Sequence, residues 1–239
     1  MKRYINYLFR KLGFEPINQE LILKEVITKK WIESFSLDVI IDIGSSDGGF
    51  SRKIKNIFPN ATIYCFEALP NSYERLLQKN EKMSNFHAFN VALSNEKGEI
   101  DFYKCENNTG SSSILEMNNV HKEAYPFTAE NTKISVKADR LDEFSQDFDL
   151  QNKNVMLKLD VQGAERIVLE GAIKTLEQVD YIFCEMNFIE TYKNCVLFGE
   201  LNSFFEEYGF ILSGMENISQ NNKTGEFLQA DAYFKKMKK

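Results

Sequence analysis

Cysteine is scarce in this chain of 239 residues, and its four cysteines form no C-x-x-C pair or other spacing typical of a metal site. Cys65 and Cys184 lie inside apolar runs, where a free cysteine behaves as a small hydrophobic residue. The sequence therefore predicts neither a structural zinc site nor a dense disulfide framework. It favours a reducing compartment, and we expect the protein to be cytoplasmic.

Long hydrophobic runs are missing as well. No stretch approaches the ~20 apolar residues that a membrane-spanning helix needs. Residues 1–11 carry basic charge but lack the long apolar segment and the cleavage site of a signal peptide. This segment fits either a helix packed on the edge of the domain, which we favour, or a basic amphipathic helix that makes peripheral contact with a membrane.

An excess of basic residues is also absent. The chain has 29 lysines and arginines against 35 aspartates and glutamates, which gives a net charge of -6. Because binding to nucleic-acid phosphates requires a basic face, this balance argues against a nucleic-acid partner. The apolar fraction of 43% and the 20 phenylalanines predict instead a globular protein with a substantial core.

Strand and helix patterns alternate along the chain, which is typical of an α/β sheet with helices on both faces. We predict a helical segment over residues 1–35, packed on the domain, and a single α/β domain over residues 36–239. Apolar runs predict core strands at 39–43, 62–67, 86–92, 155–160, 181–185, 210–213 and 227–234, and two further strands at 97–103 and 134–138. Helical spacing predicts helices at 50–58, 71–79, 141–144, 164–176 and 201–208. The polar connection 105–131 is too long for an ordinary loop and indicates a functional one.

A glycine-containing turn, Asp42-Ile43-Gly44-Ser45-Ser46-Asp47-Gly48-Gly49, follows the first strand directly and precedes a helix. Glycine allows a tight turn and lets a ligand approach the backbone closely. The spacing Gly44-x-x-x-Gly48 differs from the G-x-G-x-x-G of dinucleotide-binding folds, in which a pyrophosphate rests on the helix N-terminus. Asp42 and Asp47 would repel such an anion, whereas they suit the amino group and the sulfonium of S-adenosyl-L-methionine (SAM). The turn thus favours SAM over NAD as the cofactor.

Two acidic residues end later strands of the predicted sheet. Glu67 ends the second strand, near the offset from Gly44 at which an acid accepts hydrogen bonds from ribose hydroxyls in nucleotide-binding sheets. Asp160 ends the fourth core strand, so we expect its side chain at the same edge of the sheet as Gly44. A cap on the following helix is the alternative role for Asp160.

Three motifs follow one another in a specific order: Val39-Ile40-Ile41-Asp42-Ile43-Gly44-Ser45-Ser46-Asp47-Gly48, then Phe66-Glu67-Ala68-Leu69-Pro70, then Lys158-Leu159-Asp160-Val161-Gln162-Gly163-Ala164-Glu165. In this combination the chain resembles the FkbM methyltransferase family from about Val39 to Phe234. The resemblance implies a Rossmann-like fold with a seven-stranded, mostly parallel sheet, helices on both faces and an antiparallel last strand. It also implies transfer of a methyl group from SAM to a hydroxyl, typically on a saccharide or a natural product.

The same resemblance assigns site residues by position. It implies that Asp42 and Gly44 line the methionine part of SAM, that Glu67 holds the ribose, and that Val91 and Ala92 lie near the adenine. The full predicted cofactor-binding set is Asp42, Gly44, Ser45, Gly48, Glu67, Ala68, Val91 and Ala92. The sequence departs from the family at two positions: Ala68 stands where proline is frequent, and Gln162 where glutamate is frequent. The second departure removes a charge near the cleft.

Methyl transfer to a hydroxyl requires removal of the hydroxyl proton, which calls for a general base. Asp160 is the first candidate. His121 is the second, on the expectation that the polar connection closes over the substrate; the alternative is a histidine solvated on its loop. Asp160, Glu185 and Asn187 offer oxygen ligands for Mg²⁺, but the resemblance does not imply a metal, and Glu185 can instead bond backbone groups. We therefore assign no metal ligands.

Two other classes of function stay open at this point. An NAD-linked oxidoreductase shares the general fold, although the missing G-x-G-x-x-G and the position of Asp42 argue against it. A non-catalytic partner with the same fold is compatible with the sequence. The identity of the acceptor is not predicted, because acceptor choice depends on loops such as 105–131.

Overall fold

The computed structural model describes residues 27–237 and divides the chain into two compact units, residues 1–36 and 37–239. The predicted helical segment 1–35, with its basic start and the proposed membrane contact, lies mostly outside the described residues. Its described part is helical over residues 27–33. Among the described residues, no helix is long and apolar enough to cross a membrane.

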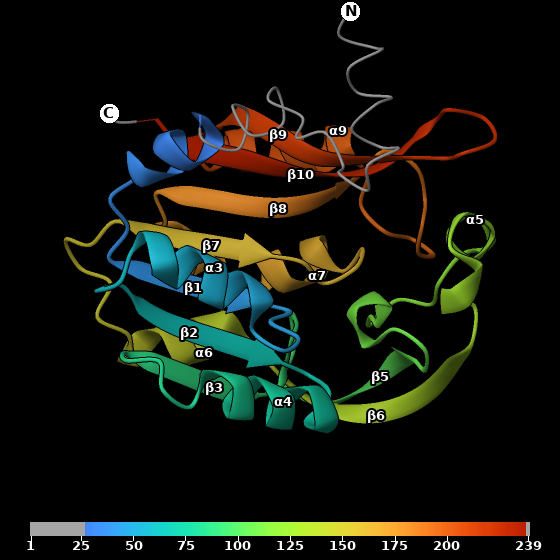
Figure 1. Cartoon of the computed structure of the whole chain (residues 1–239), viewed down its shortest axis with the longest axis horizontal. Coiled ribbons are helices and arrows are strands. Elements are labelled where there is room, and N and C mark those ends of the chain that lie inside the picture. Colours follow the sequence, from blue (N-terminus) through green and yellow to red (C-terminus); the bar gives the residue numbers. More distant parts are fainter. Residues whose placement is uncertain (1–26, 238–239) are drawn as a thin grey trace, which may run out of the picture. The chain divides into compact units, whose positions relative to one another are not determined.

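The second unit is built on a seven-stranded sheet in the order β3-β2-β1-β7-β8-β10-β9 (Figure 1). Neighbours from β3 to β8 pair in parallel, whereas β10 is antiparallel to both β8 and β9. The predicted fold class is thereby confirmed, including the antiparallel last strand. The strands are β1 (Val39–Ile43), β2 (Thr62–Glu67), β3 (Phe86–Asn90), β7 (Val155–Leu159), β8 (Tyr181–Asn187), β9 (Phe210–Gln220) and β10 (Phe227–Lys236).

Helices cover both faces of this sheet. In Figure 1, α3 and α4 lie in front of the strands, and α6 and α9 lie behind them. The helices are α3 (Gly49–Ile57), α4 (Pro70–Asn80), α6 (Leu141–Phe144), α7 (Glu165–Glu170), α8 (Ile173–Leu176) and α9 (Phe198–Glu207), with a 3₁₀ turn, η3 (Ser145–Asp147), after α6.

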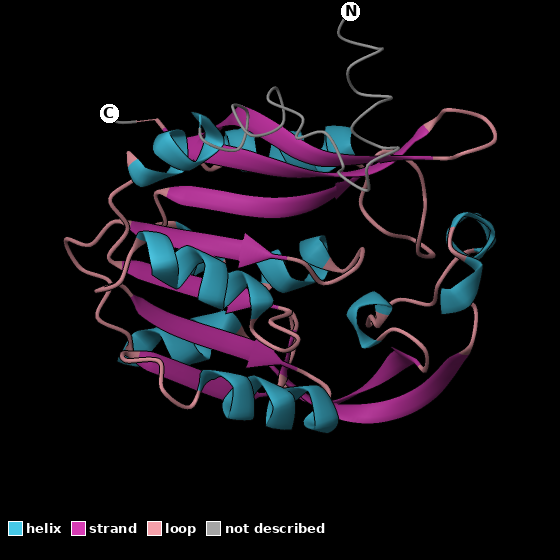
Figure 2. Cartoon of the chain, viewed as in Figure 1, coloured by secondary structure: helices cyan, strands magenta, loops and turns pink. Residues whose placement is uncertain are grey.

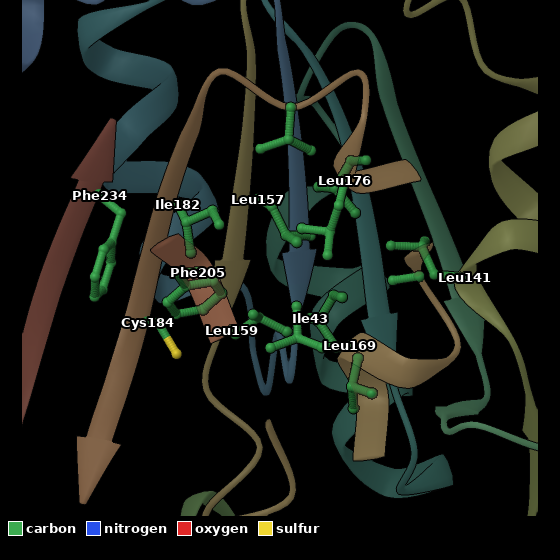
Figure 3. Close-up of a cluster of buried hydrophobic side chains, with 14 of the residues drawn as sticks. Ile43, Leu141, Leu157, Leu159, Leu169, Leu176, Ile182, Cys184, Phe205 and Phe234 are labelled. Atoms are coloured by element: carbon green, nitrogen blue, oxygen red, sulfur yellow. The ribbon is translucent and has the colours of Figure 1, made fainter. Parts of the chain in front are cut away.

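The central strands β1 and β7 are buried at every position, as expected for parallel strands covered on both faces. Along both strands, alternate side chains face opposite sides of the sheet. Ile43, Leu157 and Leu159 pack with side chains from α6 to α9 in the main hydrophobic core (Figure 3). Asp42 and Lys158, which are partners in the β1–β7 register, face the other side, toward α3.

The prediction of a single helix over residues 164–176 is wrong, because two short helices, α7 and α8, occupy this segment. They separate at Gly171, where an added Cβ would lie 2.0 Å from the backbone oxygen of Ser94. The carboxylate of Asp142 accepts hydrogen bonds from the backbone N–H groups of Lys174 (3.1 Å) and Thr175 (2.9 Å) and so caps the start of α8. Tertiary packing and a cap from a distant residue therefore divide an amphipathic pattern that is continuous in the sequence.

The strand predicted over 86–92 is also divided, because Ala92 and Leu93 leave the main sheet after β3. They form β4 (Ala92–Leu93), which belongs to a second, three-stranded sheet in the order β4-β6-β5. Its other members, β5 (Gly98–Cys105) and β6 (Asn131–Asp139), confirm the strands predicted at 97–103 and 134–138.

The connection between β5 and β6 contains more structure than its polar sequence indicates. It includes two 3₁₀ turns, η1 (Thr109–Ser111) and η2 (Pro126–Thr128), and a short helix, α5 (Asn119–Ala124). Figure 2 shows this connection beyond the ends at which the arrows of β1, β2 and β7 point. The long connection therefore lies at the carboxyl ends of the central strands, where open α/β sheets bind their ligands.

Candidate active site

A cavity opens at the carboxyl ends of β1, β2 and β7, close to the reversal of strand order in the sheet. Its volume is about 540 Å³, open solvent included. The wall combines the turn after β1, the end of β2, the start of the second sheet, the β5–β6 connection and the loop after β7. The lining residues are Ile43, Gly44, Ser46, Phe66, Glu67, Ala68, Val91, Ala92, Leu93, Phe102, Thr109, Gly110, Ser112, Ile114, Asp160 and Val161.

The turn after β1 depends on Gly44. This residue has a φ of 73°, in the left-handed region, and an added Cβ would lie only 1.9 Å from the backbone oxygen of Asp160. The N–H groups of Gly44 and Ser45 both donate to the oxygen of Phe66, at 3.0 Å each. Glycine therefore lets the turn pack tightly between the ends of β2 and β7.

A buried ion pair holds the backbone of this turn in place. Lys158 Nζ lies 3.0 Å from Asp42 Oδ1 and donates to the backbone oxygens of Ile43 (3.1 Å) and Gly44 (2.9 Å). Ser51 Oγ donates to Asp42 Oδ2 at 2.6 Å. Burial alone would lower the pKa of Lys158, but the carboxylates of Asp42 and Asp160 outweigh it and raise that pKa. Lys158 therefore stays cationic and fixes the backbone on which the cavity floor is built.

These pairings contradict the charge argument by which the sequence favours SAM over NAD. Asp42 and Asp47 were expected to repel an anion and so to discriminate against NAD, but both are neutralised within the fold. Asp42 is paired with Lys158, and Asp47 forms ion pairs with Lys79 and Arg52. The local charge of the turn therefore does not discriminate between SAM and NAD.

Glu67 is positioned as a ribose acceptor would be. Its side chain lines the cavity although the residue is only 7% exposed. The backbone N–H of Ser46 donates to Oε2 (2.8 Å) and that of Leu69 to Oε1 (2.9 Å), which leaves a second lone pair on each oxygen for a ligand. Burial raises the pKa of Glu67 to about 7, against the opposing effect of these two hydrogen bonds. The structure thus holds both carboxylate oxygens of Glu67 in place at the cavity wall, and their contact with a ribose stays a prediction.

Asp160 lines the same cavity, directly after β7. Its side chain is 44% exposed, with Oδ1 accepting a hydrogen bond from Gln162 Nε2 (2.9 Å) and Oδ2 lying 3.7 Å from Lys158 Nζ. The alternative that Asp160 caps the following helix is wrong, because α7 starts at Glu165 and its N-cap is Ala164. Asp160 is therefore a partly solvated carboxylate that faces the cavity.

The predicted cofactor-binding residues fall into two groups. Gly44, Glu67, Ala68, Val91 and Ala92 line the cavity, together with Asp160. The other three do not line it, and their direct contact with a cofactor stays a prediction. Asp42 is paired with Lys158, and Ser45 Oγ donates to the backbone oxygen of Asp42 (2.6 Å). Gly48 is the N-cap of α3.

His121 differs from the expectation of a solvated histidine on a mobile loop. It is only 3% exposed, in α5, and its ring packs against Tyr125 and Tyr192 with centroid separations of 5.0 and 5.1 Å. Burial lowers its pKa to about 4, so His121 is neutral near neutral pH. The expectation of a solvated side chain is wrong because the β5–β6 connection folds over it, and His121 does not line the cavity.

The oxygen trio considered for Mg²⁺ is not assembled. Gln162 Nε2 lies between Asp160 Oδ1 (2.9 Å) and Glu185 Oε2 (2.8 Å), and Asn187 Oδ1 accepts a hydrogen bond from Thr191. The alternative partners proposed for Glu185 are also wrong, since the amides of Gln162 and Gln229 hold it instead of backbone groups. Within residues 27–237, no three His, Cys, Asp or Glu side chains converge as metal ligands.

Several residues of the site are not predicted from the sequence. Lys158 lies within one of the motifs, and in the structure it joins Asp42, the turn and Asp160. Tyr192 contacts both the loop after β7 and the β5–β6 connection through its hydroxyl. A lysine inside the apolar run 155–159 is the one signal that pointed to Lys158, because a buried lysine requires a carboxylate partner.

Comparison with known proteins places this arrangement in a family. The model of the methyltransferase FkbM domain matches residues 42–212. The relatives include 2-O-methyltransferase NoeI of Sinorhizobium fredii, 32% identical over 162 residues that cover 65% of each chain. Methyltransferase sdnD of Sordaria araneosa is 26% identical, covering 83% of this chain and 84% of its own. Hexuronic acid methyltransferase AglP of Haloferax volcanii is 24% identical, covering 63% and 56%.

The match to the first and third of these relatives thus spans less than two thirds of their length. Among solved structures, precorrin-6y C5,15-methyltransferase from Geobacter metallireducens is similar with a TM-score of 0.47 and 12% identity over 87% of both chains.

The family match covers most of the cavity wall, from the turn after β1 through Glu67 to Asp160. The cavity is compatible with the cofactor of the family, since Glu67 presents a buried carboxylate at its wall. The NAD-linked oxidoreductase considered from the sequence is therefore set aside. The chain belongs to the FkbM family of methyltransferases, and its cofactor is S-adenosyl-L-methionine.

Proposed function

We propose that the protein transfers the methyl group of SAM to a hydroxyl group of a saccharide or a related natural product. The observation that carries this proposal is the placement of Asp160. A half-exposed carboxylate shares the cavity with the predicted ribose acceptor Glu67, where it can receive the proton of an acceptor hydroxyl. The names of two relatives, a 2-O-methyltransferase and a hexuronic acid methyltransferase, support a sugar acceptor.

In this proposal each wall of the cavity has a separate task. Glu67 accepts hydrogen bonds from the ribose, Val91 and Ala92 pack near the adenine, and Gly44 lines the part of the cavity that receives the methionine part. When bound, SAM supplies a methyl group that its sulfonium activates for transfer. The chain contributes position and proton removal: Oδ1 of Asp160 is held by Gln162, and Oδ2, which lies 3.7 Å from Lys158 Nζ, takes the hydroxyl proton.

The net charge and the cysteines support two further parts of the proposal, the class of acceptor and the cellular location. A net charge of -6 favours an acceptor other than a nucleic acid. All four cysteines are buried and unpaired, which agrees with a reducing compartment and supports a cytoplasmic location.

An acceptor screen tests the proposal. The purified protein is incubated with SAM and, separately, with neutral oligosaccharides, uronic-acid oligosaccharides and RNA, and both S-adenosylhomocysteine and the methylated product are measured. We expect methylation of a saccharide hydroxyl. Methylation of RNA alone would contradict the proposal, and SAM binding without turnover on any acceptor would favour the non-catalytic alternative.

Glu67→Ala is expected to weaken SAM binding by about 1–3 kcal/mol, because the ribose hydroxyls lose their acceptor. Since the pKa of Glu67 is raised to about 7, the wild type should also bind SAM more weakly as the pH falls below that value. Calorimetry across this pH range measures both effects, and the pH dependence should disappear in the variant. Glu74→Ala, which removes an exposed acid on α4, serves as the control. Unchanged SAM affinity in folded Glu67→Ala would refute the assignment.

The β5–β6 connection is expected to form part of the acceptor site, because Thr109, Gly110, Ser112 and Ile114 line the cavity. Amide hydrogen exchange in residues 106–130 should be faster in the free protein than with S-adenosylhomocysteine and acceptor bound. The buried strand β7 provides the internal reference. Exchange in the connection that is already as slow as in β7, and that does not respond to the acceptor, would speak against this role.

A further inference from the structure

Gln162 makes an unusual set of contacts for a neutral side chain. Its Nε2 donates to Asp160 Oδ1 at 2.9 Å and to Glu185 Oε2 at 2.8 Å, so both amide hydrogens point to carboxylates. Its Oε1 lies 2.8 Å from the hydroxyl of Tyr192. Gln162 therefore joins the ends of β7 and β8 through one amide group.

The backbone around Gln162 is held in a conformation that only strong local support maintains. Gln162 has a φ of 56°, in the left-handed region that a side chain with a Cβ rarely adopts. The fully buried Glu165 accepts through Oε1 from the N–H groups of Val161 and Gly163, at 3.2 Å each. Ser113 Oγ donates to the oxygen of Val161 at 3.2 Å. The loop after β7 is thus bonded on both sides of Gln162, which fixes where its side chain points.

The two neighbouring carboxyl groups explain why an amide donor fits at this point. Asp160 and Glu185 lie together at adjacent strand ends, and burial together with the charge of Asp160 raises the pKa of Glu185 well above its usual value. Lys158 approaches Asp160 at Oδ2 (3.7 Å) and not at the oxygen that Gln162 holds. Since the nitrogen of Gln162 is within hydrogen-bonding distance of both carboxylates, it occupies the position that a bridging cation would take.

We propose that Gln162 is a positioning residue for Asp160, whose amide replaces a bridging cation between the Asp160 and Glu185 carboxylates. Tyr192 keeps the carbonyl end of this amide turned away from the carboxylates, and its hydroxyl also lies 2.9 Å from the backbone oxygen of Ser111 in the β5–β6 connection. The consequence for catalysis rests on the proposed function, in which Asp160 receives the hydroxyl proton. The consequence for cation binding does not depend on it.

Two substitutions test separately the neutral charge and the length of this side chain. Gln162→Glu keeps the shape and the backbone preference but brings a third carboxylate against Asp160 and Glu185. Gln162→Asn keeps the amide and is well suited to the left-handed backbone, yet it is too short to join both carboxylates. Gln151→Glu is the matched control, because Gln151 is exposed in the turn at the opposite end of β7.

Kinetics form the first test. Gln162→Asn should lower kcat on the order of 10²-fold through misplacement of Asp160, while its affinity for S-adenosylhomocysteine stays close to that of the wild type. A purely structural role would instead weaken ligand binding and turnover together. The control variant should retain the wild-type kcat.

Titration with Mn²⁺ alone, followed by electron paramagnetic resonance, forms the second test and needs no acceptor. Gln162→Glu should bind Mn²⁺ on the order of 10-fold or more tightly than the wild type, because three carboxylates then converge on one point. Gln162→Asn and the control should bind as the wild type does.

Two results would overturn the proposal: equal Mn²⁺ affinity in Gln162→Glu and the wild type, or a wild-type kcat in Gln162→Asn. If Gln162→Glu fails to fold, the kinetics of Gln162→Asn decide the proposal by themselves. A wild type that methylates no acceptor contradicts the proposed function, whereas the Mn²⁺ titration still tests the role of Gln162.

Discussion

Asp160→Asn is expected to lower kcat by roughly 10²–10⁴-fold while the fold and most of the SAM affinity remain. Asparagine has the same shape and can still accept the hydrogen bond from Gln162 at Oδ1, but it cannot take a proton from an acceptor hydroxyl. Steady-state kinetics at saturating SAM measure the loss. The thermal unfolding midpoint, measured in parallel, shows that the variant is folded.

A chelator separates this role from that of a metal ligand. If Asp160 acts as the base, EDTA should leave wild-type turnover unchanged, whereas a metal ligand at this position would make turnover sensitive to EDTA. Asp149→Asn, at a carboxylate with 82% side-chain exposure, is the control for the substitution itself. A wild-type kcat in Asp160→Asn would eliminate both catalytic readings.

Lys158→Met should lower the free energy of unfolding by about 3–5 kcal/mol, because it leaves the Asp42 carboxylate buried without a cation. The turn before α3 also loses the two hydrogen bonds from Lys158 Nζ to its backbone. Urea unfolding followed by circular dichroism measures the change. Since the turn forms one wall of the cavity, SAM affinity should fall as well.

A second substitution tests whether the uncompensated charge causes this loss. Asp42→Asn in the Lys158→Met background removes the stranded carboxylate and should recover a large part of the stability. Lys153→Met, at an exposed lysine before β7, is the matched control and should change stability by less than about 0.5 kcal/mol. A loss below about 1 kcal/mol in Lys158→Met would show that the pair contributes little.

The fold was predictable because its signals are local. Apolar runs such as Val39–Ile43 and Val155–Leu159 mark the central strands, which are buried at every position. The glycine turn after β1 and the acid that ends β2 place the cofactor cavity at the correct edge of the sheet. These features depend on residues close in sequence and on the general geometry of parallel sheets.

The networks that hold the site were not predictable in the same way. The pairing of Lys158 with Asp42 depends on the register between β1 and β7, which join residues more than a hundred positions apart. The burial of His121 depends on how the polar connection folds against Tyr192. The break between α7 and α8 depends on the distant Ser94 and Asp142. In each case the deciding partner is far away in the sequence.

The second sheet makes the β5–β6 connection a segment that can be exchanged between members of the family. β5 and β6 pair from Gly98 and Ala138 out to Cys105 and Asn131, so the connection starts and ends at two adjacent positions. An insert closed by such a hairpin can change in length and sequence without stretching the catalytic sheet. Grafting residues 106–130 from another family member onto this chain is therefore a direct route to chimeras with a new acceptor preference.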